Sequence, residues 1–178
     1  MSKVKQKYLP YAGIGSRKTP KEVLDTMRYI SSDLEAMGFI LRTGGAAGAD
    51  SAFLEGIQDV NNVELYLPWQ GYNDYESDYH KVSKAAIQMA AQYHPNWAAC
   101  KDSVRKLHGR NCNIMAGTNV LKPMLSEFVI CWTPNGSATG GTGMAITIAD
   151  SFLIPVFDFG LGIDITMNQL ERYIQEKY

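Results

Sequence analysis

The chain of 178 residues is poor in cysteine, and its few cysteines and histidines form no recognisable ligand pairs. They are Cys100, Cys112 and Cys131 together with His80, His94 and His108. An odd number of cysteines without a CxxC spacing argues against a disulfide framework and is typical of free thiols in a reducing compartment. We therefore expect a cytoplasmic protein with no metal site and no cofactor.

Long apolar runs are also missing. No apolar segment approaches the roughly 18 residues that a transmembrane helix needs, and none follows the basic residues of the first seven positions. The sequence therefore predicts neither a membrane span nor a secretory signal peptide.

The chain also lacks an excess of charge of either sign, because 17 Lys and Arg residues nearly balance 18 Asp and Glu residues. A protein that binds the polyanionic backbone of a nucleic acid usually carries a basic excess. We therefore expect a small anionic ligand, and nucleic acid is disfavoured as a partner.

Apolar residues make up 46% of the sequence, and their spacing changes repeatedly between short runs and helical periodicity. The clearest helix follows Thr19 and Pro20. Thr19 and Glu22 match a capping box, and Pro20 suits the first helical position. Apolar residues then recur every three or four positions until Gly38, a typical helix stop.

Strands and helices alternate along the whole chain. The expected strands are Leu9–Ile14, Phe39–Arg42, Val63–Leu67, Phe128–Trp132 and Ile154–Phe157, and the best-bounded later helices are Lys81–Gln92 and Asp164–Glu176. The alternation over the first 67 residues predicts parallel strands with right-handed crossovers. We expect one Rossmann-like α/β domain over residues 1–178, doubly wound, with a mainly parallel sheet and helices on both faces.

Glycine-rich turns follow three of the expected strands. They are Gly13–Arg17, Gly44–Asp50 and Gly140–Gly143. Parallel strands carry such turns to one carboxyl edge, where open α/β sheets bind ligands. Glycine lets the backbone approach a ligand, and the following helix offers free N–H groups to an anion. The turns together predict a site for the phosphate and sugar of a nucleotide or nucleotide derivative.

Polar and aromatic residues near these turns are candidate ligand contacts. Arg17 can hold a phosphate through two parallel hydrogen bonds. Asp50 has two interpretations, because it can accept hydrogen bonds from ribose hydroxyls or from its own loop. Asn111 lies near a buried helical line and needs a partner in the ligand or in the protein. Trp69 and Tyr72 either stack on a base or pack over the core.

Four segments, taken in order, resemble the superfamily that joins the DprA/Smf proteins with the LOG phosphoribohydrolases. They are Gly13–Arg17 (similar to the GSR motif), Gly44–Asp50 (SGxAxGxD), Arg110–Gly117 (RNRxIAGL) and Gly136–Ala145 (SGxxxTA). The subtype is similar to one common in phage genomes. The resemblance implies a Rossmann-like sheet, a homodimer or higher homo-oligomer, and phosphate held by the glycine turns.

The resemblance leaves three functions open. The first is binding of a nucleotide or nucleotide-derived signal, such as a cyclic ADP-ribose-type molecule, which a phage protein could sequester as a counter-defence. The second is an N-glycosidase, or phosphoribohydrolase, acting on nucleoside 5′-monophosphates. The third is DprA-like binding of single-stranded DNA, which calls for a basic groove with stacking aromatics and is disfavoured by the charge balance.

One departure from the LOG pattern favours binding over catalysis. LOG enzymes carry a PGGxGTxxE motif, and Thr147 stands at the position of its glutamate. A threonine cannot supply the carboxylate that an oxocarbenium-like transition state requires. We therefore assign no catalytic residue, although Asp50, Glu55, Glu127 or Asp150 could substitute for the missing carboxylate.

The predicted ligand-binding residues fall into groups by role. They are Gly13, Gly15, Ser16 and Arg17 for one phosphate; Gly140, Gly141 and Thr142 for a second phosphate or the ribose; Asp50 and Asn111 as polar specifiers; Trp69 as a base stacker; and Gly44, Gly45, Ala46 and Arg110 as further contacts. The expected ligand is a nucleotide or a nucleotide-derived signal.

Overall fold

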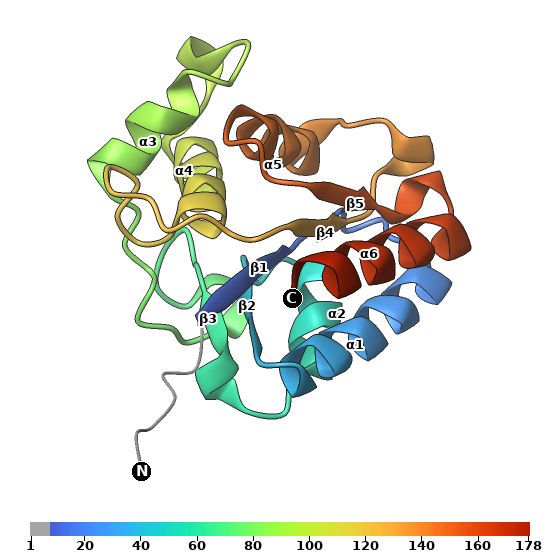
Figure 1. The fold of residues 1–178 in the computed structure, drawn as a ribbon. Coiled ribbons are helices and arrows are strands. Elements are labelled where there is room, and N and C mark those ends of the chain that lie inside the picture. Colours follow the sequence, from blue (N-terminus) through green and yellow to red (C-terminus); the bar gives the residue numbers. More distant parts are fainter. Residues whose placement is uncertain (1–7) are drawn as a thin grey trace.

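A computed structural model describes residues 8–178 and contains a five-stranded sheet (Figure 1). Its strands are β1 (Leu9–Gly13), β2 (Phe39–Thr43), β3 (Val63–Leu65), β4 (Val129–Cys131) and β5 (Val156–Asp158). Neighbouring strands all pair in parallel, in the order β3-β2-β1-β4-β5. The expected parallel, Rossmann-like sheet is confirmed. The basic segment at positions 1–7 lies outside the described residues.

Helices cover both faces of this sheet (Figure 1). They are α1 (Lys21–Ala36), α2 (Ala49–Gly56), α3 (Lys84–Ala91), α4 (Asp102–Ala116), α5 (Gly140–Ser151) and α6 (Ile163–Lys177). Apolar residues of α1, α2 and α6 form the core on one face, and those of α3, α4 and α5 form the core on the other. The sheet is therefore doubly wound, as predicted. Among residues 8–178, no helix is long and apolar enough to cross a membrane.

The burial of β4 explains its unbroken apolar sequence. Val129 and Cys131 belong to the core under α4 and α5, whereas Phe128 and Ile130 belong to the core under α1 and α6. Successive side chains of a strand point to opposite faces, so a strand covered on both sides needs an apolar residue at every position. All four side chains are fully enclosed.

The start of α1 differs from the expected capping box. The helix begins at Lys21, with Pro20 in the cap position and no side-chain hydrogen bond to the helix. The Thr19 hydroxyl donates instead to the backbone carbonyl of Ser16 at 2.7 Å. Thr19 therefore closes the turn that follows β1 and does not cap the helix.

The strand order places a topological switch point between β1 and β4. From β1 the chain moves outward through β2 and β3, and it then returns to the other side of β1 to form β4 and β5. Crossovers in the two directions leave a crevice at the carboxyl ends of the two central strands, where open α/β sheets bind ligands.

Candidate functional site

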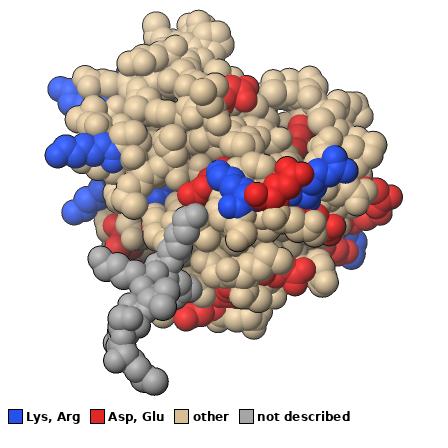
Figure 2. All heavy atoms as spheres, viewed as in Figure 1, with Lys and Arg blue, Asp and Glu red and all other residues tan. Residues whose placement is uncertain are grey.

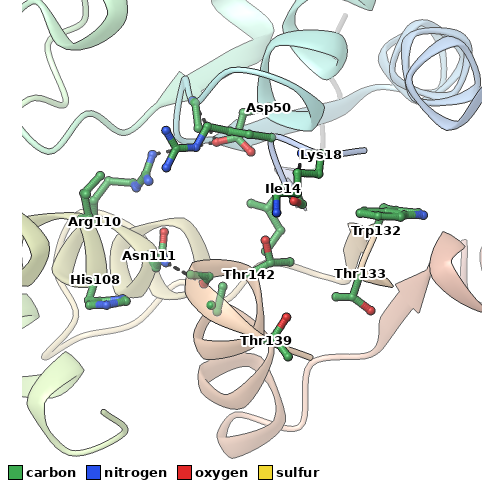
Figure 3. Close-up of a pocket in the computed structure, with 18 of the residues that line it drawn as sticks. Ile14, Lys18, Asp50, His108, Arg110, Asn111, Trp132, Thr133, Thr139 and Thr142 are labelled. Atoms are coloured by element: carbon green, nitrogen blue, oxygen red, sulfur yellow. Dashed lines mark hydrogen bonds and ion pairs between the residues drawn. The ribbon is translucent and has the colours of Figure 1, made fainter. Parts of the chain in front are cut away.

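A cavity of about 510 Å³ lies at this switch point. Its wall comes from the turn after β1, the loop after β2, the end of β4, one face of α4 and the first turn of α5 (Figure 3). The lining residues are Ile14, Gly15, Ser16, Arg17, Lys18, Ala46, Asp50, Tyr72, Val104, Leu107, His108, Arg110, Asn111, Trp132, Thr133, Pro134, Thr139, Gly140, Gly141, Thr142 and Ala145. The three predicted glycine turns therefore contribute to one cavity.

The turn after β1 presents two cations to the cavity. The Ser16 hydroxyl accepts a hydrogen bond from the Lys18 amide at 3.0 Å, and the Ser16 carbonyl accepts from Thr19. These local bonds fix the backbone of the turn. Arg17 and Lys18 are exposed and form no ion pair within residues 8–178. Both cations are therefore available to an anionic ligand.

Asp50, at the start of α2, holds the second glycine loop in place. Its buried carboxylate accepts hydrogen bonds from the amides of Gly44 and Ala46, each at 3.2 Å. Burial raises the pKa of the Asp50 carboxyl, and Arg110 and these amides act against that shift. Of the two interpretations from sequence, the structure shows the contact of Asp50 with its own loop.

Arg110 connects α4 to the same loop. Its guanidinium donates to the carbonyl of Gly44, lies 3.9 Å from the Asp50 carboxylate and sits 5.9 Å from the centre of the Tyr72 ring. A Cβ atom at Gly44 would collide with this guanidinium, so glycine allows Arg110 to occupy this position. Burial lowers the pKa of Arg110 while Asp50 opposes the change, and the side chain stays cationic at neutral pH. The buried pair therefore places a positive and a negative group side by side in the cavity wall.

The first turn of α5 forms the opposite wall and is open to the cavity. Thr139 precedes the helix without a side-chain cap, and Gly140 has a φ of 60°. A Cβ atom at Gly140 or Gly141 would meet no protein atom within 4 Å. The Asn111 amide donates to the Gly141 carbonyl at 3.3 Å (Figure 3), which ties α4 to this turn. The turn therefore leaves space and uncapped N–H groups for an anion.

The structure brings most of the predicted ligand-binding residues to this cavity. Those that line it are Gly15, Ser16, Arg17, Ala46, Asp50, Arg110, Asn111, Gly140, Gly141 and Thr142. Those that do not line it are Gly13, Gly44, Gly45 and Trp69. The ligand contacts of all these residues stay a prediction.

Packing explains the positions of Gly13, Gly45 and Trp69, as the contact with Arg110 does for Gly44. A Cβ atom at Gly13 would lie 2.7 Å from the Phe53 ring, so Gly13 allows α2 to approach β1. Gly45 has a φ of 68° and faces Leu67 rather than the cavity. Trp69 is partly exposed and contacts the edge of Tyr72, with ring centres 5.2 Å apart. Tyr72, and not Trp69, is the aromatic residue of this loop that reaches the cavity.

Lys18, His108 and Trp132 are among the lining residues that were not predicted contacts. Trp132 directly follows β4, so the rule that ligands bind at the carboxyl ends of central strands could have identified it. His108 precedes Asn111 by one helical turn on α4, and this i, i+3 spacing places both on one helix face. Burial lowers the pKa of His108 to about 4, aided by His94 and Arg110, so the ring is neutral at pH 7.

The cavity contains little that could act as a glycosidase nucleophile. Asp50 is the one acidic residue in its wall, and its carboxylate is bonded to backbone amides. Thr147 does not line the cavity, and its hydroxyl donates to the Gly143 carbonyl at 3.1 Å. Residues 8–178 contain no group of three or more His, Cys, Asp or Glu side chains that could hold a metal ion.

Comparison with known proteins agrees with this architecture. No family model matches the chain, and no curated protein matches it. Among solved structures, the chain is similar to DNA processing protein A from Helicobacter pylori, reported for its unique single-stranded DNA binding mode, with 23% identity and a TM-score of 0.55. The match covers 84% of this chain and 64% of that chain. The chain therefore has a DprA-like fold and spans less than two thirds of its structural neighbour.

The neighbour overturns one expectation from sequence. A protein with this fold binds single-stranded DNA, so disfavouring nucleic acid on the basis of net charge was wrong. Lys and Arg residues on the face shown in Figure 2 are interspersed with Asp and Glu residues, and the whole sequence has 17 of the former and 18 of the latter. The cavity, by contrast, is lined by Arg17, Lys18 and Arg110 against Asp50 alone. A local cationic site is thus hidden within a balanced total charge.

Proposed function

We propose that the chain binds single-stranded DNA at this cavity and holds one backbone phosphate at its centre. The observation that carries the proposal is the convergence of Arg17, Lys18 and the open first turn of α5 on one space. Charged hydrogen bonds to phosphate are stronger than neutral ones, and uncapped helix amides favour an anion. The DNA-binding structural neighbour supports the same choice of ligand.

The two ends of the cavity suit the two nucleosides that flank that phosphate in a DNA strand. His108 and Asn111 lie at one side, and Trp132 and Thr133 lie at the opposite side (Figure 3). Aromatic side chains such as Trp132 and Tyr72 offer stacking surfaces, each worth about 1–3 kcal/mol per base in single-strand binding. A phosphate site between two base-binding ends would therefore hold one dinucleotide step of a DNA strand.

A nucleotide-derived small molecule is the second candidate ligand. The volume of about 510 Å³ falls within the roughly 300–1,000 Å³ of typical small-molecule sites. Two base-binding ends around a cationic centre also suit a cyclic ADP-ribose-type signal. In this case the protein would hold the signal without cleaving it, and sequestration by a phage protein against host defence is the corresponding biological role.

One binding experiment separates these ligands. Labelled single-stranded oligonucleotides, nucleoside monophosphates and cyclic ADP-ribose are each titrated with the protein, and the mixtures are then separated by chromatography. We expect saturable oligonucleotide binding that weakens when Arg17 is changed to alanine but not when Arg172, an exposed arginine on α6, is changed. Tight binding of intact cyclic ADP-ribose without oligonucleotide binding would replace the first candidate by the second. Time-dependent release of free base would instead establish the glycosidase.

A further inference from the structure

We propose that the α4 end of the cavity recognises a heterocyclic base, with His108 donating a hydrogen bond from Nε2 to an acceptor atom of that base. The inference rests on the proposed function, because it assigns the place of one base of the bound strand. It concerns a residue that lies outside the glycine turns and outside the four motif-like segments.

The first support is an unused hydrogen-bonding group in the cavity wall. His108 lines the cavity with only 8% of its surface exposed, and its side chain forms no hydrogen bond within residues 8–178. Buried polar side chains nearly always have a partner. The enclosed nitrogen without a partner is Nδ1, so Nε2, which also forms no hydrogen bond within residues 8–178, is the ring nitrogen left to meet a ligand in the cavity.

The second support is the state of the ring. Burial lowers the pKa of His108 to about 4, so the ring carries one proton at neutral pH. Nδ1 is completely enclosed and has no partner, and an orphaned buried N–H group is rarer than an orphaned acceptor. This places the proton on Nε2, which is the nitrogen left to meet a ligand. A neutral donor suits an uncharged base rather than a phosphate.

The third support is the surface beside His108. Val104, Leu107 and Ala145 line the cavity close to it in sequence or on the adjoining helix α5. Val104, Leu107, His108 and Asn111 follow the i, i+3, i+4, i+7 spacing of one face of α4. An apolar wall with a polar edge is the lining that a flat heterocycle requires, because its faces are apolar and its edge carries the hydrogen-bonding atoms.

The aromatic residues that pack around His108 do not accept a hydrogen bond from it. His94 and Trp97 lie with their ring centres 4.9 and 6.4 Å from that of His108. These are tilted ring contacts that pack against the side chain. They hold the imidazole in place without supplying an acceptor.

The test compares an oligothymidylate with an abasic oligonucleotide of the same length in fluorescence anisotropy titrations. His108→Phe keeps a ring of similar size without either nitrogen, His108→Gln places an amide donor near Nε2, and His108→Asn places one near Nδ1. A neutral hydrogen bond contributes about 0.5–1.5 kcal/mol. We therefore expect the Phe and Asn variants to bind oligothymidylate about fivefold more weakly, and the Gln variant to stay close to the wild type.

Affinity for the abasic strand separates the failure of this inference from that of the proposed function. It should be equal in all four proteins, which also shows that each variant folds. Binding of neither strand by the wild type contradicts the proposed function itself. Binding of both strands by the wild type, with no selective loss of oligothymidylate affinity in the Phe and Asn variants, overturns the base subsite and leaves His108 as a packing residue.

Discussion

Gly15 and Gly48 of the first two turns and Gly140 and Gly141 of the third look alike in sequence but have different surroundings. A Cβ atom at Gly15 would lie 2.6 Å from the Ala49 side chain, and one at Gly48 would lie 2.7 Å from the Ser16 carbonyl oxygen. A Cβ atom at Gly140 or Gly141 would meet no protein atom within 4 Å. Protein atoms fill the space beside the first pair, whereas the second pair lines the cavity and has open space beside it.

This difference separates two uses of glycine within one site. In the first two turns glycine permits β1, β2 and α2 to pack closely, and this packing positions Arg17, Lys18 and Asp50. In the third turn Gly140 and Gly141 keep the start of α5 open, so that a ligand can approach the backbone. Substitutions in the two regions should therefore affect different quantities, with stability changing in the first and binding in the second.

The largest expected effect is on stability, from Gly48→Ala. Gly48 has a φ of 91°, which an L-residue rarely adopts, and the new methyl group would also meet backbone atoms of Ser16 and Arg17. Backbone strain and overpacking each cost about 1–3 kcal/mol. We expect the free energy of unfolding to fall by about 3 kcal/mol in urea denaturation. A loss below about 0.5 kcal/mol, the range of ordinary surface changes, would show that the first turns are not packed as described.

The next effect is on binding, from Arg17→Ala. Removing a charged hydrogen bond to phosphate costs about 1.5–3 kcal/mol, and Arg17 is exposed without an ion pair within residues 8–178. We expect this loss of affinity for single-stranded DNA in a titration, with a thermal midpoint like that of the wild type. The charge-matched control, Arg172→Ala, should change neither quantity. Equal affinity of the Arg17 variant and the wild type would remove Arg17 from the site.

The pH dependence of the free energy of unfolding tests the burial of His108 in the cavity wall. The pKa of His108 is about 4 in the folded protein, whereas an unfolded histidine titrates near 6.5. The unfolded chain therefore takes up a proton first as the pH falls, so stability is fully present above 6.5 and is lost towards 4. We expect a loss of about 2 kcal/mol, allowing for partial solvation. The free energy of unfolding is measured against pH for the wild type and for His108→Phe. Curves that run parallel between pH 4 and 7 would contradict the lowered pKa of His108.

The smallest effect on stability, and the sharpest contrast with Gly48, comes from Gly141→Ala. Alanine at a compatible helical position stabilises a protein by about 0.5 kcal/mol, and no protein atom opposes the new methyl group. The methyl group would enter the cavity, so DNA affinity should fall while the thermal midpoint stays the same or rises. A variant that binds as tightly as the wild type would show that the ligand does not approach the first turn of α5.

The fold could be predicted from the sequence because its determinants are local. Periodic apolar residues identify α1, and unbroken or alternating apolar runs identify strands such as β4. Element ends were less predictable. The expected strand Ile154–Phe157 is observed as Val156–Asp158, because pairing with β4 sets its ends. Domain organisation and oligomeric state stay predictions.

The site could be predicted only in outline. The sequence located the glycine turns, but which glycines border the cavity depends on distant residues such as Phe53 behind Gly13 and Arg110 beside Gly44. For the same reason the structure brings Tyr72, and not Trp69, to the cavity. Total charge could not reveal that Arg17 and Lys18 share a wall with Arg110, since they come from different elements.

The salt dependence of DNA binding tests the central claim most directly. Affinity for an oligothymidylate is measured over a range of salt concentrations for the wild type, the double variant Arg17→Ala, Lys18→Ala, and the control Arg172→Ala. Each lost phosphate contact lowers the slope of log K against log salt by about 0.7 for single strands. The account predicts weaker binding and a slope reduced by about 0.7–1.4 in the double variant, with the control unchanged. An identical slope in all three proteins would contradict a phosphate site at the turn after β1.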